Sequence, residues 1–477
     1  MLELLCILSA TAIGAMLAYR FAGLRGFAPR WASALLIFGT GTAIGIGIAS
    51  IIFFVCRILA PGFSVLPILV EIALAWWLGL EIYRTRDRAQ VAAQTRTFAW
   101  SGALALALVL VLGIGTLGMS SFWEANPQGN WDAWAIWNLR ARFLASGGNL
   151  ASRAWSPVLT GTHPEYPLLV SGFIARCWSY SGSMSALAPM ATSYAFFLAL
   201  VAMGTGGLAA LEGGSLGLLF GLAVGSCPVV LYEVPTQYSD IPLACYFAGA
   251  LILMLLERPI AAGLLASLAA WTKDEGQLFV AAFLVLMAIT RRRQFPRALA
   301  GMIPVGILLL VFKLFVARSN SSLLAQSTMG AGLWPRLTDL SRYLTVVRIA
   351  TRQLWDMRSG WYHPILPPLI LAFALKFKTN WRRDVLPAGT LTVVMLAGYF
   401  WVYIITPNNL YWQVQGSIAR LTAQLWPLGL IAIFAGLRAP EQTGQEVVIE
   451  VPQTKAGRSG KRNQPGGKAA SQPRGRK

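Results

Sequence analysis

The chain has 477 residues, of which 56% are hydrophobic and 12% are charged, and its mean hydropathy is +0.59. This composition excludes an ordinary soluble domain, in which about a quarter of the residues are charged. The net charge of +20 comes from basic residues that stand in short clusters between apolar runs and in the C-terminal tail. It therefore indicates membrane topology and not binding of nucleic acid.

Apolar runs recur along the whole chain. A helix needs roughly 20 apolar residues to cross about 30 Å of hydrocarbon, and about 13 runs come close to that length. We predict an all-α polytopic membrane protein with a retained first helix, because no basic residues precede the first run as they do in a signal peptide. The five cysteines stand singly, which predicts neither a disulfide nor a metal site. The predicted spans are residues 2–19, 33–56, 64–83, 99–119, 187–211, 215–233, 238–257, 260–272, 276–290, 297–317, 362–377, 385–405 and 421–437.

The basic clusters predict the orientation of these helices. If successive spans cross the membrane in alternating directions, the basic clusters and the C-terminal tail lie on one side. The positive-inside rule identifies this side as the cytoplasm. The hydrophilic segments 120–186, 318–361 and 406–420 then face the exterior, as does the N-terminus. The tail from Thr454 onward is basic, contains Gly and Pro but no acid, and should be disordered. The clusters are Arg20, Arg25 and Arg30; Arg84, Arg86 and Arg88; Arg291, Arg292 and Arg293; and Lys376, Lys378, Arg382 and Arg383.

The first external segment contains an unusual group of aromatic and charged residues, "NWDAWAIWNLRAR". A rotation of about 100° per residue places Asp132 and Ile136 on one helical face and Trp134 and Trp137 on the opposite face. We expect a helix at the membrane surface with Asp132 directed at the bundle, where a carboxylate is costly unless it is paired or used. The alternative is that Asp132 only occupies the first helical turn behind an Asn130 cap.

Further charged residues are predicted at the same external face. His163 and Glu165 flank a proline in "GTHPEYPLL"; they form either a polar corner of the loop or part of a site. No second His or Cys stands near His163 at the spacing of a zinc site. Asp240 begins a helix in "YSDIPLA", and Lys273 and Glu275 lie in a tight turn in "WTKDEG". Their shared side of the membrane is stronger evidence for a site than any one of them.

Together, "NWDAWAIWNLRAR", "HPEYPLL", "YSDIPLA" and "WTKDEG" resemble motifs of the GT-C superfamily of membrane glycosyltransferases. Among its members, bacterial relatives of protein O-mannosyltransferases and lipid A aminoarabinose transferases are the most similar. The resemblance covers about residues 99–317. It implies a GT-C-like bundle with an essential acid in a long external loop and a sugar donor on polyprenyl phosphate. It also implies the bacterial inner membrane, with the site facing the periplasm.

The resemblance places Asp132 at the position of the catalytic acid, His163 and Glu165 in the second loop motif, and Asp240 and Lys273 at polar helix ends. This sequence lacks an acid directly beside Asp132. It therefore leaves open whether a divalent cation, Mg²⁺ or Mn²⁺, takes part, and nothing in the sequence requires one.

The chemistry of such a transfer suits these residue types. A carboxylate, assigned to Asp132, takes a proton from the acceptor hydroxyl, and cations hold the leaving phosphate. Nearby tryptophans either stack on a sugar or anchor the helix at the interface. The acceptor is a glycan, a lipid or a protein. The candidate substrate-binding residues are Trp131, Trp134, Arg140, His163, Glu165, Asp240, Lys273, Glu275 and Arg420.

We divide the chain into accessory helices (1–97), a catalytic module (98–317), C-terminal helices (318–437) and a cytoplasmic tail (438–477). A transporter or flippase of lipid-linked sugars is one alternative function. It would need ionisable groups near the middle of the bilayer, where the sequence has few. A non-catalytic relative with the same fold is the other alternative.

Overall fold

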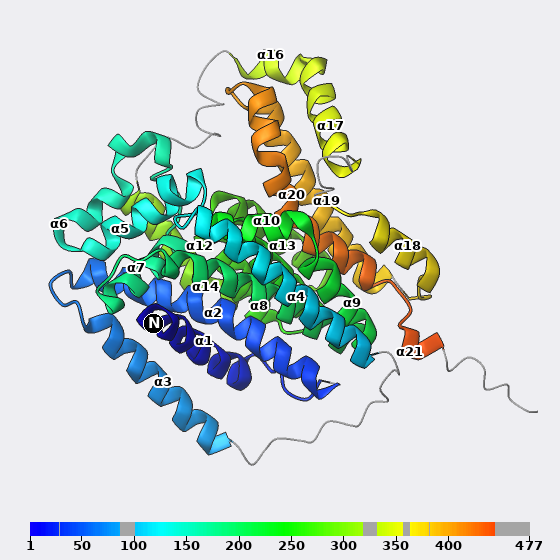
Figure 1. The fold of residues 1–477 in the computed structure, drawn as a ribbon, viewed down its shortest axis with the longest axis horizontal. Coiled ribbons are helices and arrows are strands. Elements are labelled where there is room, and N and C mark those ends of the chain that lie inside the picture. Colours follow the sequence, from blue (N-terminus) through cyan, green and yellow to red (C-terminus); the bar gives the residue numbers. More distant parts are fainter. Residues whose placement is uncertain (28, 86–100, 318–331, 356–362, 381, 444–477) are drawn as a thin grey trace, which may run out of the picture.

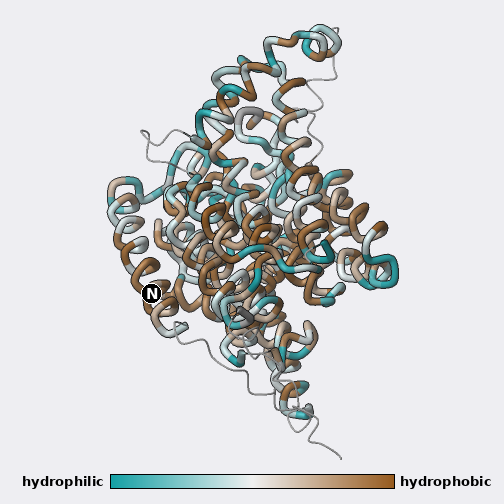
Figure 2. The backbone as a smooth tube through the Cα atoms, turned by 90° about the vertical axis from the view of Figure 1, so that its right-hand side faces the viewer, coloured by the Kyte–Doolittle hydropathy of each residue, from teal (hydrophilic) through white to brown (hydrophobic). Residues whose placement is uncertain are grey.

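The computed structural model describes residues 1–27, 29–85, 101–317, 332–355, 363–380 and 382–443. Within these ranges the chain is almost entirely helical, and the β interaction it contains is one isolated bridge between Phe377 and Leu437 (Figure 1). The prediction of an all-α chain is confirmed. Figure 2 shows hydrophobic residues along the central helices and hydrophilic residues mainly at the connecting turns.

Eight helices among the described residues are long and apolar enough to cross a membrane. This supports an integral membrane protein, but the predicted count of 13 spans is not confirmed. Three shorter apolar helices, α11 (Asp240–Leu255), α12 (Pro259–Thr272) and α18 (Leu366–Leu375), and α13 (Asp274–Thr290) match other predicted spans. The eight are α1 (Leu2–Phe21), α2 (Arg30–Leu59), α3 (Leu66–Thr85), α4 (Ser101–Ala125), α8 (Leu187–Glu212), α14 with the π-helical turn η5 (Phe295–Val316), α19 (Arg382–Ile405) and α20 (Leu410–Phe434).

One predicted span, 215–233, is broken into two helices. These are α9 (Gly214–Gly225) and α10 (Pro228–Thr236), which meet at an angle of 59°. Pro228 occupies the first turn of α10, where its missing N–H costs no hydrogen bond but where it cannot continue the preceding helix. If the bent pair is one span, the described residues contain nine.

The centre of the bundle is α11, every residue of which is buried. α8 and α12 pack against it, and α2 packs against α8. The N-terminal helices approach closely because small residues line their contact: a Cβ atom at Gly14 would lie 1.9 Å from the Gly41 carbonyl oxygen. The first two helices are therefore built into the bundle.

The first external segment does not form the regular surface helix that we predicted. It starts with a π-helical turn, η2 (Ala133–Trp137), which shifts the angular position of the residues that follow. As a result Trp137 is buried, as are Arg140 and Leu144 of the following helix α5, whereas Trp131 and Trp134 are exposed. The remaining helices of this segment are α5 (Asn138–Ser146), α6 (Gly148–Ala151), η3 (Ser152–Trp155), η4 (Pro157–Thr162) and α7 (Leu169–Ser181).

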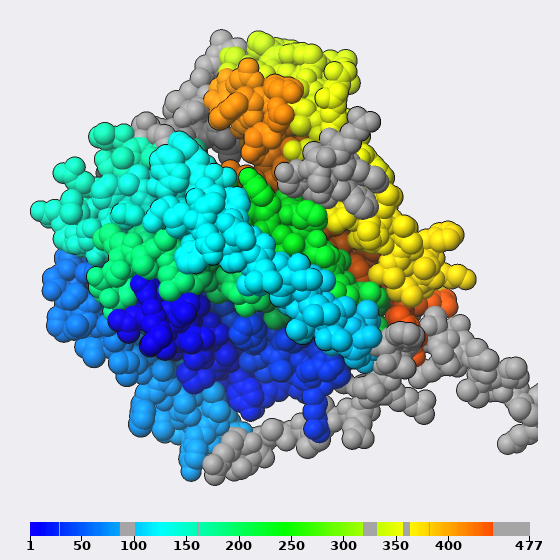
Figure 3. Space-filling view, viewed as in Figure 1, coloured from blue at the N-terminus to red at the C-terminus, as the bar shows by residue number. Residues whose placement is uncertain are grey.

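α20 begins earlier than predicted. The Asn409 side chain accepts a hydrogen bond from the Trp412 backbone N–H at 3.0 Å and so caps the helix. Most of the predicted external segment 406–420 is therefore helical. The protruding ends of α19 and α20 pack against α16 (Leu333–Thr338) and α17 (Leu340–Trp355) in a separate lobe, seen at the top of Figure 3. Its buried residues are Val346, Ile349, Tyr403, Ile404, Val414 and Ile418.

Ion pairs bring two of the basic clusters, those of Arg291 and of Lys378 with Arg383, to one end of the bundle. Glu257, in the turn between α11 and α12, pairs with Arg291 at 3.6 Å and with Arg383 at 2.9 Å. Lys378 pairs with Glu212 at the end of α8, at 2.6 Å. The predicted common position is thus supported for these two clusters, whereas Arg86, Arg88 and the tail from residue 444 lie outside the described residues. Asp240 and Lys273 are at the opposite ends of α11 and α12.

Candidate functional site

The candidate site is centred on an arginine shared by two aspartates. The Arg420 Nη2 atom lies 2.7 Å from the Asp132 Oδ2 atom and 3.0 Å from the Asp240 Oδ2 atom. The Arg420 Nε atom also donates to Asp240, at 3.1 Å. Asp132 precedes η2, Asp240 begins α11 and Arg420 lies in the middle of α20, so three elements far apart in the sequence meet here.

A second cation, Lys273, continues this network. Its Nζ atom lies 3.6 Å from the Asp240 Oδ1 atom and 2.7 Å from the Glu275 Oε1 atom. Burial opposes the charged form, but Asp240 and Glu275 outweigh it and raise the pKa of Lys273 above its usual range. Lys273 therefore carries its charge at neutral pH. The tight turn predicted at Lys273 is confirmed, because α12 ends at Thr272 and α13 begins at Asp274.

Polar residues fix the position of Asp240. The Gln424 side-chain amide donates to the Asp240 Oδ1 atom, and the Tyr399 hydroxyl donates to the Gln424 carbonyl oxygen at 2.5 Å. Gln424 lies one helical turn after Arg420 on α20, so one face of this helix contacts Asp240 twice. A buried carboxylate with this many donors is held in a single orientation.

An aromatic ring supports the arginine. The Arg420 guanidinium lies 4.1 Å from the centre of the Tyr238 ring, in a cation–π contact. The Tyr238 hydroxyl oxygen accepts a hydrogen bond from the Asp132 backbone N–H at 3.4 Å. Burial and the charge of Asp132 raise the pKa of Tyr238 to about 12, so its hydroxyl is neutral at physiological pH. Sequence reasoning did not identify Tyr238, although it stands two residues before Asp240.

The second loop motif forms a neighbouring cluster. The His163 Nδ1 atom lies 3.1 Å from the Glu165 Oε1 atom, and the His163 ring stacks on Tyr166 with centroids 4.5 Å apart. The Lys313 Nζ atom donates to the Glu165 backbone carbonyl at 2.8 Å and to the Asp274 carboxylate at 2.9 Å. This lysine links the loop motif to the turn that contains Lys273.

Lys313 and Glu233 were both missed by the sequence reasoning. Each is a charged residue inside an apolar run, which is a signal of a functional or paired group in a membrane helix. Glu233 is buried near the end of α10, and the Thr236 hydroxyl donates to its side chain at 3.3 Å.

Arg140 is placed away from the shared-arginine network. It is fully buried, its Nε atom donates to the Ala154 carbonyl at 3.2 Å and its Nη2 atom donates to the Tyr166 carbonyl. Burial lowers its pKa to about 10, so it stays charged at neutral pH. In this arrangement Arg140 ties together the segments of the first external loop. The exposed Trp131 and Trp134 rings contact each other edge to face, with centroids 5.7 Å apart.

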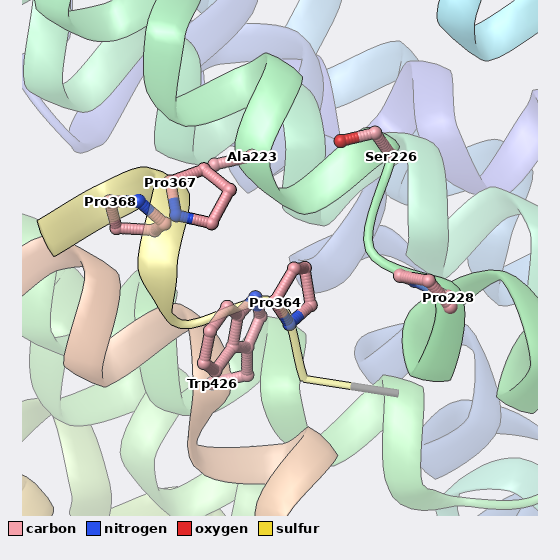
Figure 4. A pocket seen from close by; sticks show the side chains of 7 residues that line it. All are labelled: Ala223, Ser226, Pro228, Pro364, Pro367, Pro368 and Trp426. Carbon is pink, nitrogen blue, oxygen red and sulfur yellow. The ribbon is translucent and has the colours of Figure 1, made fainter. Parts of the chain in front are cut away.

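A small apolar cavity of about 230 Å³ lies beside α20 at the break between α9 and α10 (Figure 4). Trp426 lines it, six residues past Arg420 and so roughly 9 Å further along the helix. The residues that line it include no ionisable group, so the charged cluster, and not this cavity, contains the candidate chemistry. The lining residues are Ala223, Ser226, Pro228, Pro364, Pro367, Pro368 and Trp426.

The described residues contain no group of three or more His, Cys, Asp or Glu side chains arranged to hold a metal ion. Asp132 and Asp240 direct their oxygens to Arg420 instead. The geometry of these residues does not fit a resident divalent cation, so no step below is assigned to one.

Comparisons with protein-family models, curated proteins and solved structures found no significant match to this chain.

Proposed function

We propose that the protein is a membrane glycosyltransferase of the GT-C type. It transfers a sugar from a polyprenyl-phosphate-linked donor to a hydroxyl group of a glycan, lipid or protein acceptor. One observation carries the proposal: the acid of the first external loop, Asp132, contacts Arg420 at 2.7 Å within a network that also includes Lys273. A base beside cations that can bind the leaving phosphate suits this reaction.

Each residue has a role in the proposed reaction. The acceptor hydroxyl oxygen bonds to the anomeric carbon of the sugar as its proton passes to the Asp132 carboxylate. The bond between that carbon and the phosphate oxygen breaks, and its electrons remain on the departing polyprenyl phosphate. Arg420 binds the phosphate through its planar guanidinium and Lys273 acts as a point charge. Asp240 holds both cations in position.

The proposed orientation follows the charge distribution. The end of the bundle with the basic clusters faces the cytoplasm, as the positive-inside rule predicts. The site then faces the exterior of the bacterial inner membrane. A lipid-linked donor suits this position, since its sugar and phosphate lie at the membrane surface while its chain remains in the bilayer.

A donor comparison tests the proposed function. Purified protein in lipid nanodiscs is incubated with envelope acceptors and with either a polyprenyl-phosphate sugar or the matching nucleotide sugar. We expect transfer from the lipid-linked donor alone. Efficient transfer from the nucleotide sugar alone would overturn the proposal. Movement of the intact lipid-linked sugar across a vesicle bilayer, without transfer, would identify a flippase instead.

Deletion of the gene identifies the sugar. Mass spectrometry of polyprenyl-phosphate sugars and envelope glycans compares cells with and without the protein. We expect the unused lipid-linked donor to accumulate on deletion and one sugar to be lost from an envelope component. Unchanged pools of both would contradict a transferase.

A further inference from the structure

Both cations of the proposed phosphate site are paired with carboxylates of the protein. The Arg420 Nη2 atom contacts Asp132 at 2.7 Å, and the Lys273 Nζ atom contacts Glu275 at 2.7 Å. Asp240 contacts both cations as well. An incoming anion must therefore compete with a carboxylate of the protein itself.

The three carboxylates are held to different degrees. Asp240 is fully buried and accepts hydrogen bonds from Arg420 and from Gln424. The side chains of Asp132 and Glu275 are 23% and 20% exposed, and each pairs with its cation through one oxygen. Removing Asp240 from its partners would leave a buried charge unpaired, whereas Asp132 and Glu275 can exchange a cation for water at much lower cost.

We propose that the Asp132 carboxylate occupies the position of a phosphate oxygen on Arg420, and that a phosphate group displaces it on binding. The ligand is a phosphate ester, and its identity is the part of this inference that rests on the proposed function. While the Asp132 Oδ2 atom contacts Arg420, this oxygen is directed at the cation. Displacement therefore releases it to meet the acceptor hydroxyl once the donor is bound.

The displacement requires little movement. Asp132 stands three residues after Gly129, which has a φ of +74°, and the Asn130 backbone N–H between them donates to the Thr236 carbonyl at 3.1 Å, so the backbone there is fixed. Rotation about the side-chain bonds of Asp132 is sufficient to break its contact with Arg420, and such changes occur on a fast timescale at exposed positions.

A binding experiment tests this inference. Binding of farnesyl phosphate to the full-length protein in nanodiscs is measured from tryptophan fluorescence, since Trp131 and Trp134 flank Asp132. Asp132→Asn removes the competing charge, so the ligand no longer has to break a charged hydrogen bond to Arg420. We therefore expect about tenfold tighter binding. The matched control is Glu124→Gln, which removes the same charge from an exposed position near the end of α4. We expect it to bind like the unaltered protein.

Two further ligands show whether the protein recognises the phosphate group or the lipid chain. Inorganic phosphate should show the same order of affinities if the phosphate alone is recognised, and farnesol should show no difference between the variants. Arg420 itself is left unaltered, because its removal would leave the buried Asp240 with only one of its two cations and endanger folding.

The outcomes of this binding experiment differ from those of the transfer assay, so the displacement and the proposed function can fail separately. Equal affinities of the unaltered protein and Asp132→Asn for farnesyl phosphate would overturn the displacement. A gain in affinity in Glu124→Gln as large as that in Asp132→Asn would overturn it as well. Both conclusions hold even if Asp132→Asn abolishes sugar transfer. Tighter binding in Asp132→Asn with normal sugar transfer would support the displacement and exclude Asp132 as the base.

Discussion

Two aspartates bind the same arginine, and the burial of each determines whether it contributes mainly to stability or to activity. Asp240 is fully buried, and its charge is compensated by Arg420, Lys273 and a side-chain amide. Asp132 is partly exposed and belongs to a loop. Removing one partner of a buried pair is expensive, whereas removing an exposed one is not. Substitutions at the two positions should therefore have separable effects on folding and on activity.

Asp132→Asn should fold normally and lose sugar transfer. The amide keeps the shape of the carboxylate but cannot take up a proton, so we expect a normal amount of protein in the membrane and at least about a hundredfold loss of activity. Activity and membrane content are measured together, with Glu124→Gln as the control. Normal transfer by Asp132→Asn would place the base elsewhere, with Glu165 and Asp240 as the next candidates.

Asp240→Asn should mainly reduce stability. It leaves Arg420 and Lys273 without their buried carboxylate, at a cost of about 3–5 kcal/mol. We expect a lower midpoint of thermal unfolding in detergent than for Asp132→Asn. Equal midpoints of the two variants would show that Asp240 does not hold the cations in place.

His363 should make the protein less stable in acid. Burial lowers its pKa to about 4, and its Nε2 atom lies 2.8 Å from the Thr422 hydroxyl. The unfolded chain binds a proton near pH 6.5, so between about pH 6.5 and 4 only the unfolded state is protonated at this position and stability falls as the pH falls. The contribution is about 3 kcal/mol at most. The drop in unfolding midpoint between pH 7 and pH 5 should be smaller in His363→Gln, and an equal drop would assign the effect to other groups.

At the scale of helices, hydrophobic runs predicted most helices, whereas polar residues and caps determined where each helix begins and ends. The predicted start of the last span, residue 421, is wrong because Arg420 and several glutamines reduce the hydropathy of a segment that Asn409 nevertheless caps as a helix. The π-helical turn η2 has no periodic signal, so the rotation of the residues after it could not be predicted. For that reason the burial of Arg140 could not be predicted.

Asn409→Ala should loosen the start of α20 without changing the core. Loss of an N-terminal cap costs about 1 kcal/mol. We expect faster hydrogen exchange of backbone amides in residues 410–414 and unchanged exchange in α11, measured by mass spectrometry. Equal exchange in residues 410–414 of both proteins would show that packing against α17, and not the cap, determines this helix end.

At the scale of the molecule, the sequence predicted a bundle with charged residues at one face, but not which of them meet. Asp132, Asp240, Lys273 and Arg420 converge because their helices are neighbours in the bundle, a relation that no local pattern contains. Asp240 and Arg420 are 180 residues apart. Lys313 stands out in the sequence as a charge inside an apolar run, whereas Tyr238 has no such signal and was identified only in three dimensions.

The two ends of the bundle should lie in different compartments. Val158→Cys introduces an exposed thiol in η4, and Thr379→Cys introduces one in the turn before α19. The five native cysteines are buried and give little background. An impermeant maleimide should label Val158→Cys in spheroplasts and Thr379→Cys only after the membrane is permeabilised. Labelling of both in sealed spheroplasts would contradict the orientation and the external site.

The long separation between Asp240 and Arg420 also has a consequence for biogenesis. Asp240 is inserted with α11, Lys273 follows in the next hairpin, and Arg420 is synthesised 180 residues after Asp240. At about 5–20 residues per second the delay is roughly ten to forty seconds. During translation the nascent bundle thus contains a carboxylate with one of its two cations missing. Chains that terminate before α20 should keep this defect and be degraded, so we expect a complete site only in chains translated through α20.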